Sequence, residues 1–164
     1  MSIARPRQPL EEQPVNISSD ELRTLQLGPL WVLSALAGRC SRFEPEELAA
    51  FWDTVVAVAL RTPDRARRLL TSTSTDRTGL LLDFELDDRP VVSGFGQVLA
   101  VLDNLAPPTG PDYRLALVNI AIGLGRARGP YGRRTTPEDE QMILLIAALL
   151  EIESAPGLPD EVLV

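Results

Sequence analysis

The chain has 164 residues and a formal net charge of −7 at pH 7, and it contains neither histidine nor lysine, so all sixteen basic residues are arginine. Without histidine, no side chain titrates near neutral pH unaided, and without lysine there is no Schiff-base or phosphate-loop ammonium group. The excess of negative charge argues against general binding to nucleic acid, because a polyanion is repelled on average.

Length and cysteine content favour one self-sufficient domain. A chain of this size buries enough surface to form a core without metal or disulfides, and the single Cys40 cannot form an internal disulfide. The longest uninterrupted apolar run, 142–150, has nine residues, whereas a membrane-spanning helix needs about 20. We therefore expect a soluble, cytoplasmic protein with no transmembrane segment. Arginine without lysine points to the codon usage of a GC-rich, bacterial genome.

The two ends of the chain differ in composition from its middle. Residues 1–17 are rich in proline, glutamine, glutamate and arginine and poor in large apolar groups, so burial cannot offset the entropy lost on ordering. Residues 154–164 contain two prolines and a glycine. We expect a flexible N-terminal arm at 1–17, a single domain at 18–153 and a flexible tail at 154–164.

The first helix of the predicted domain has a recognisable start. Ser18 stands three residues before Glu21, which is the spacing of a capping box. The helix is expected to run toward Gly38, with a break or kink near Gly28-Pro29, because proline cannot donate its helical hydrogen bond.

The second helix has the clearest pattern in the chain. Pro45 suits its first turn, and a continuous apolar face follows. That face consists of Leu48, Phe51, Trp52, Val55, Val56 and Ala59. Trp52, like Trp31 in the preceding helix, is expected in the core.

The middle of the chain is harder to assign. Thr62-Pro63-Asp64 predicts the start of a short helix through about Leu70, and the polar run 71–79 predicts a loop. Residues 80–87 alternate apolar and acidic side chains, which is the period of a strand, yet there is no second convincing strand to pair with them. We expect an irregular or short helical segment there.

Three further helices are predicted toward the C-terminus. The first contains Phe95 to Leu105, the second begins at Pro111, and the third begins at Thr136-Pro137 and runs to about Glu153. Segments 115–124 and 142–150 are apolar on nearly all sides, which is typical of central helices. The whole predicts an all-α fold, a compact bundle of about six or seven helices.

Two stretches, 35–48 and 126–140, repeat the same order of parts. Each has an apolar helix, a Gly/Arg loop, an acidic turn opened by proline and another apolar helix, which predicts a helical hairpin used twice. Over about residues 19–152 this organisation resembles the TerB-like family of tellurite-resistance domains. The resemblance implies a helical bundle acting as a stress-response sensor or scaffold. The family's aspartate before the glycine is Ala37 here, so its metal ligands do not carry over.

An acidic segment is the first candidate site. Asp83, Glu85, Asp87 and Asp88 have the alternating spacing that begins a calcium loop. The sixth position, which needs glycine, holds Asp88, and the twelfth, which needs glutamate, holds Gly94. A looser magnesium or calcium site remains as an alternative to a solvated acidic edge, and we expect no cofactor.

An arginine-rich loop is the second candidate site. It surrounds Gly129-Pro130 and contains Arg126, Arg128, Tyr131, Arg133 and Arg134. Guanidinium groups bind phosphate or carboxylate in a fork, and Tyr131 can stack on a ring. The alternative is a connecting loop whose arginines pair with nearby carboxylates such as Glu138 and Asp139.

These observations favour a non-catalytic interaction or scaffold protein, since the usual acid–base and metal-binding side chains are missing. The expected partner is a protein, with a homodimer as one form. The alternatives are a module that binds a small anion or phosphate through 126–134, and an enzyme that uses paired carboxylates and a divalent metal.

Overall fold

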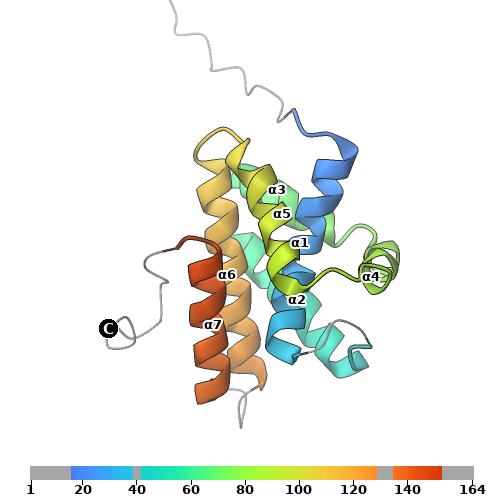
Figure 1. Ribbon diagram of the computed structural model, residues 1–164, viewed down its shortest axis with the longest axis vertical. Helices are drawn as coiled ribbons and strands as arrows, with labels where there is room; N and C mark the ends of the chain where they lie inside the picture. The colour runs from blue at the N-terminus through green and yellow to red at the C-terminus, as the bar shows by residue number, and fades with distance from the viewer. Residues whose placement is uncertain (1–15, 39–41, 129–134, 153–164) are drawn as a thin grey trace, which may run out of the picture.

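The structure is a computed structural model that describes residues 16–38, 42–128 and 135–152. Within those ranges it contains helices and no strands, which confirms the predicted all-α bundle (Figure 1). The helices are α1 (Ser19–Ala37), α2 (Pro45–Arg61), α3 (Asp64–Thr73), α4 (Arg77–Glu85), α5 (Val91–Asp103), α6 (Thr109–Arg128) and α7 (Pro137–Leu149). In this part of the chain, no helix has the length and apolar character needed to cross a bilayer.

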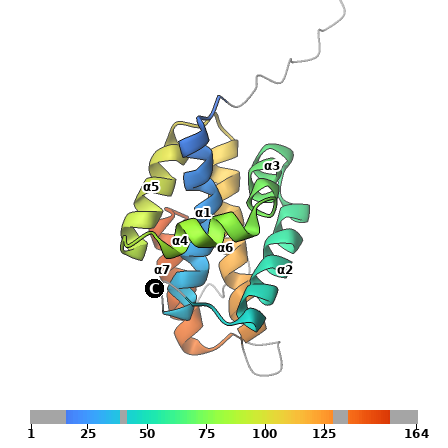
Figure 2. The same ribbon diagram turned by 90° about the vertical axis from the view of Figure 1, so that its right-hand side faces the viewer.

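Helices α1 and α6 form the centre of the bundle. α1 contacts α5, α6, α3, α7 and α4, and its residues 27–36 are all buried. Figure 2 shows α5 and α7 on one side of α1, α2 and α3 on the other, and α4 lying across its outer surface. The predicted core positions of both tryptophans are confirmed, because Trp31 and Trp52 are buried.

Local sequence sets the helix ends as expected. The backbone N–H of Glu21 donates to the Ser18 hydroxyl over 3.2 Å, and the Ser18 N–H donates to the Glu21 carboxylate over 2.9 Å, which completes the predicted capping box. Gly38 ends α1 in the left-handed region at a φ of 66°. Pro45 occupies the first turn of α2, as predicted.

The predicted break at Gly28-Pro29 is wrong, because α1 is one helix from Ser19 to Ala37. Pro29 has no N–H to donate to the carbonyl of Leu25, four residues earlier. The hydroxyl of Tyr113, from α6, donates to that carbonyl over 2.5 Å. A neighbouring helix thus supplies the missing donor, and the helix continues through the proline.

The predicted polar loop at 71–79 is also wrong for most of its length. Residues 71–73 extend α3 and residues 77–79 begin α4. The Ser72 hydroxyl donates to the Leu69 carbonyl over 2.6 Å, which satisfies one carbonyl at the end of α3. Asp76 caps α4 by accepting from the Gly79 N–H over 3.1 Å. The expectation of a short helical segment near 80–87 is confirmed by α4.

Further helix ends differ from the prediction. α5 ends at Asp103, before Leu105, and α6 begins at Thr109, before Pro111. Proline is tolerated in the first turn of a helix because its missing N–H has no helical acceptor there. Helix α7 begins where predicted, with the Thr136 hydroxyl accepting from the Asp139 N–H over 3.2 Å, but it ends at Leu149, before the predicted end at Glu153.

The prediction that 142–150 forms a central helix is wrong. α7 packs on α6 and α1 through Ile143, Ile146 and Ala147, while Leu145 is 52% exposed. α1, not α7, is the second central helix. Of the two predicted helical hairpins, only the second forms, because α6 and α7 pack together. In the first, α2 packs mainly on α3 and α6 rather than on α1.

Candidate functional site: an apolar groove between α5 and α7

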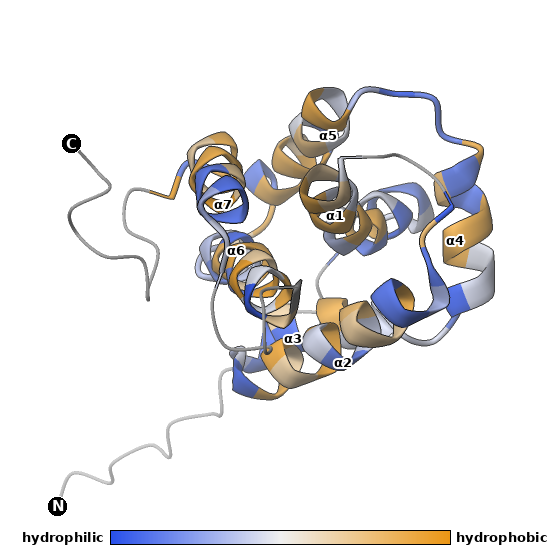
Figure 3. Ribbon diagram, turned by 90° about the horizontal axis from the view of Figure 1, so that it is seen from below, coloured by the Kyte–Doolittle hydropathy of each residue, from blue (hydrophilic) through white to orange (hydrophobic). Residues whose placement is uncertain are grey.

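An apolar groove of about 280 Å³ lies between α5 and α7, over the C-terminal part of α1. Seen from below in Figure 3, α5 and α7 both lie beside α1, with hydrophobic residues on each. We call it the α5–α7 groove. It is lined by Ser34, Ala35, Gly38, Val91, Val92, Phe95, Met142, Leu145, Ile146 and Leu149.

Part of the groove is buried and part is exposed to solvent. Phe95 and Ile146 are almost fully buried, so they belong to the core as well as to the groove. Val92, on α5, is 62% exposed and Leu145, on α7, is 52% exposed. Large apolar side chains exposed on both walls of one groove are typical of a binding surface.

One wall of the groove, α5, packs very closely on α1. A Cβ atom on Gly94 would lie 2.2 Å from the Cε2 atom of Trp31, so the α5 backbone rests directly on the indole ring. Only glycine permits this approach. Helix α7 is held by α6 and by α1, and α5 and α7 do not form an extensive contact with each other. The space between them remains open.

The C-terminal ends of α5 and α7 are joined through α6. The guanidinium of Arg114 pairs with Asp103, the last residue of α5, and lies 2.9 Å from the carboxylate of Glu151, just after α7. The Arg114 side chain is only 13% exposed, whereas both carboxylates are largely exposed. This clamp limits how far α5 and α7 can separate at that end.

Two exposed acidic residues lie close in sequence to the walls of the groove. Glu138 lies on the same face of α7 as Met142, Leu145 and Leu149, one turn before the groove, and it is exposed. Asp88 is exposed just before α5. None of the residues that line the groove is ionisable.

Arg89, the residue after Asp88, already forms an ion pair with Asp87. Arg89 Nε lies 2.8 Å and 3.0 Å from the two carboxylate oxygens of Asp87. This hydrogen bonding lowers the pKa of Asp87 below its ordinary value and raises that of Arg89. The guanidinium also stands 5.9 Å from the ring centre of Trp31. Arg89 is therefore held at the start of α5.

The four acidic residues predicted as a metal site are not gathered around one point. Asp83 and Glu85 lie on α4, while Asp87 and Asp88 follow it, and Asp87 is engaged by Arg89. Among the residues that the structure describes, no group of three or more carboxylate, cysteine or histidine side chains is placed to hold a metal ion. The described geometry therefore offers no metal centre.

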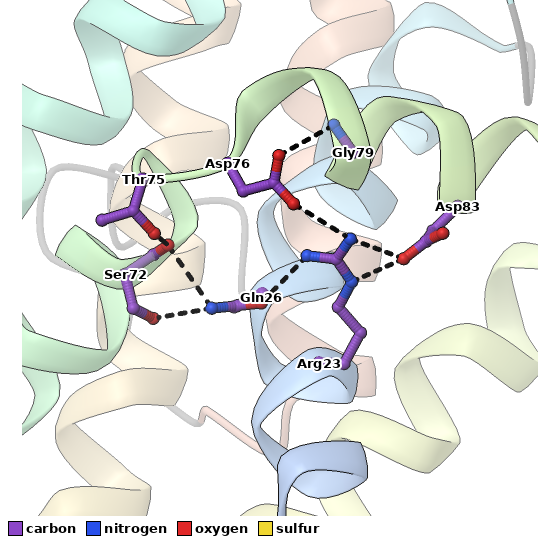
Figure 4. A network of polar contacts seen from close by, with 7 residues as sticks. All are labelled: Arg23, Gln26, Ser72, Thr75, Asp76, Gly79 and Asp83. Carbon is purple, nitrogen blue, oxygen red and sulfur yellow. Dashed lines mark hydrogen bonds and ion pairs between the residues drawn. The ribbon is translucent and has the colours of Figure 1, made fainter.

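Asp83 belongs instead to a polar network that anchors α4 (Figure 4). Arg23 Nε donates to Asp83 over 2.6 Å, and its guanidinium lies 3.5 Å from Asp76, the cap of α4. Gln26 accepts from Arg23 over 3.3 Å and donates to the Ser72 hydroxyl over 3.2 Å. Arg23 and Gln26 on α1 thus connect to the end of α3 and to two acidic residues of the α4 segment, which is a structural role.

The predicted arginine site lies largely outside the described residues. Arg126 is exposed near the end of α6, and Arg128 is the last residue of that helix. Tyr131, Arg133 and Arg134 fall in 129–134, which the structure does not describe, so anion binding by this loop stays a prediction.

A second, smaller apolar pocket of about 170 Å³ lies between α2 and α3. Val56 and Leu60, both exposed, are among its lining residues, together with Arg67. It is smaller than the α5–α7 groove and is bounded by only two helices, so it offers a partner less surface.

The sequence pattern does not indicate the groove. Residues 142–150 are apolar on nearly all sides, a pattern that predicts central burial and not an exposed binding surface. Comparisons of the chain with models of known protein families, with curated proteins and with solved structures find no match. The TerB-like resemblance therefore stays a prediction.

Proposed function

We propose that this protein is a non-catalytic interaction module that binds an amphipathic helix of a partner protein in the α5–α7 groove. The observation that carries the proposal is the exposure of Val92 and Leu145 on opposite walls of one apolar groove. Burying such surface is favourable by about 25 cal/mol per Å². A partner that covers both side chains removes them from water.

The shape of the groove suits a helix. Two helices form its walls and a third forms its floor, the arrangement in which an added helix packs side chains between ridges. On α7 the groove is lined between Met142 and Leu149, and Glu138 extends this face by one turn, so the face covers twelve residues or about 17 Å at the rise of an α-helix. A partner helix of about three turns matches that length.

The chemistry of the groove favours binding over catalysis. Its lining offers the Ser34 hydroxyl and otherwise apolar side chains and backbone. General acid–base and nucleophilic catalysis need titratable or activated groups in contact with the substrate. The predicted scaffold role is consistent with this composition, and the TerB-like resemblance would place that role in a stress response.

A peptide titration tests the proposal with a matched control. The probes are synthetic amphipathic helices of about three turns with leucine along one face, labelled with a fluorophore and titrated by anisotropy. Leu145→Glu should abolish binding because it places a charge inside the groove. Leu82→Glu should leave binding unchanged, since Leu82 is 56% exposed on α4, away from the groove. Equal binding by the wild-type protein and Leu145→Glu would contradict the proposal.

A further inference from the structure

Resting on the proposed function, we infer that the partner of the α5–α7 groove is a cationic amphipathic helix, one whose apolar face is bordered by lysine or arginine. The groove supplies the apolar contact, and the charged residues near it select the sign of the charge on the partner helix. The inference depends on where the charged residues of α5, α6 and α7 lie relative to the groove.

The first step is the charge at the open end. Glu138 extends the groove-lining face of α7 by one turn, and Gln141, the next exposed residue of this helix, is uncharged. At the start of α5, Arg89 is held by Asp87, and the neighbouring Asp88 is exposed just before the groove-lining Val91. The exposed charged residues that α7 and the segment before α5 contribute at this end, Glu138 and Asp88, are therefore both negative.

The second step is the charge at the clamped end. Asp103 and Glu151 share one arginine, Arg114, so the three groups together carry a charge of −1. Both carboxylates remain largely exposed while the guanidinium between them is mostly covered. A helix in the groove thus meets negative charge at both of its ends.

The third step is the charge of the whole molecule. The net charge of −7 adds a long-range attraction for cationic partners and repels anionic ones. Complementary charges act mainly on specificity and on the rate of association, while the apolar groove provides the affinity. The sign of the flanking charges is therefore the expected discriminator between partner helices.

Two peptides with the same leucine face test this inference, one with four flanking lysines and the other with four flanking glutamates. At low salt the lysine peptide should bind about threefold to tenfold more tightly, since exposed ion pairs are individually weak. The difference should shrink as salt is added, because salt screens exposed charges.

Charge reversal at one position locates the effect. Glu138→Lys should reduce the preference for the lysine peptide. The control is Glu85→Lys, which reverses an exposed charge on α4 and changes the net charge of the protein by the same amount. Glu138→Lys should reduce the preference more than this control does. Circular dichroism checks that both variants fold, and Glu138→Gln replaces Glu138→Lys if the reversal unfolds the first turn of α7.

The outcomes separate the two claims. Equal binding of both peptides, lost in Leu145→Glu, would keep the proposed function and overturn the charge inference. Tighter binding of the glutamate peptide would also overturn it. If neither peptide binds, the proposed function itself is contradicted. A dimer that sedimentation velocity detects in the wild type and not in Leu145→Glu would assign the groove to a second copy of the chain and overturn the cationic partner.

Discussion

The α1–α6 contact and the gap between α5 and α7 show that apolar helix surfaces in one small bundle can either pack closely or remain exposed. Where α1 meets α6, the Tyr113 hydroxyl satisfies the Leu25 carbonyl and the surrounding side chains are fully buried. Between α5 and α7, Val92 and Leu145 remain exposed. Apolar composition promotes burial, but shape and paired polar groups decide which helix surfaces close.

The largest expected effect concerns the approach of α5 to α1. Gly94→Ala places a methyl group against the Trp31 ring and should lower the free energy of unfolding by about 3 kcal/mol. Gly96→Ala is the control, because a Cβ there meets open space, and alanine favours the helix by about 1 kcal/mol. Urea denaturation measures both variants. A similar effect of the two substitutions would mean that α5 does not rest on Trp31.

The next effect concerns the closed α1–α6 contact. Tyr113→Phe removes the donor to the Leu25 carbonyl and leaves a buried acceptor unpaired, which should cost about 1 to 3 kcal/mol. Pro29→Ala restores a backbone N–H that can bond to the same carbonyl. In a double-mutant cycle, the cost of Tyr113→Phe should therefore be smaller in the Pro29→Ala background. Strict additivity would show that the two groups do not share this acceptor.

The same tyrosine predicts a loss of stability at alkaline pH. Burial raises the pKa of Tyr113 above its ordinary value of 10.0, so above that pH the unfolded chain releases a proton that the folded chain keeps. The contribution is fully present below pH 10 and should fall by about 1.4 kcal/mol per unit above it. The chain has no lysine to titrate in this range. Urea denaturation at pH 9 to 11 should show a shallower fall for Tyr113→Phe than for the wild type.

A smaller effect is expected at the clamp between α5 and α7. Arg114→Met keeps most of the apolar stem and removes the ion pairs to Asp103 and Glu151, so it should cost about 1 kcal/mol. Added salt should reduce the difference between variant and wild type. A salt-independent cost would indicate that packing of the stem, rather than charge, joins the two helices.

The smallest effect on stability is expected in the groove itself. Leu145→Glu should change the free energy of unfolding by no more than about 0.5 kcal/mol, because the side chain is already half exposed. Thermal and urea unfolding measure this directly. A large loss would show that Leu145 supports the fold and would weaken its use as a binding probe.

Sequence reasoning succeeded where the signal is local. The capping pair Ser18 and Glu21 and the apolar face of α2 identify their helices because each depends on neighbours within a few turns. For α4 the alternating pattern imitates a strand, and only the lack of a second strand to pair with it favours a short helix there. The residues that hold this helix are not part of that pattern, because Asp76 caps it and Arg23 anchors it from 60 residues away. Long-range contacts of this kind leave no periodic trace.

The candidate site shows the same limit more clearly. The pattern of α7 reveals that it is apolar all round, but only the tertiary structure shows that Leu145 faces solvent while Ile146 faces the core. One wall of the groove, α5, is positioned by the close approach of Gly94 to Trp31, two residues 63 positions apart in the sequence. Pro29 does indicate a long-range contact, because the Leu25 carbonyl that Pro29 cannot pair with needs a donor from elsewhere. The structure shows that this donor is Tyr113.

Methyl NMR of the folded protein, titrated with the lysine-flanked amphipathic peptide, tests the central claim most directly. If the peptide binds in the α5–α7 groove, the methyl signals of Val92, Met142, Leu145 and Leu149 should shift together and saturate together. Shifts centred on Val56 and Leu60 in the α2–α3 pocket, or no shifts at all, would contradict the account.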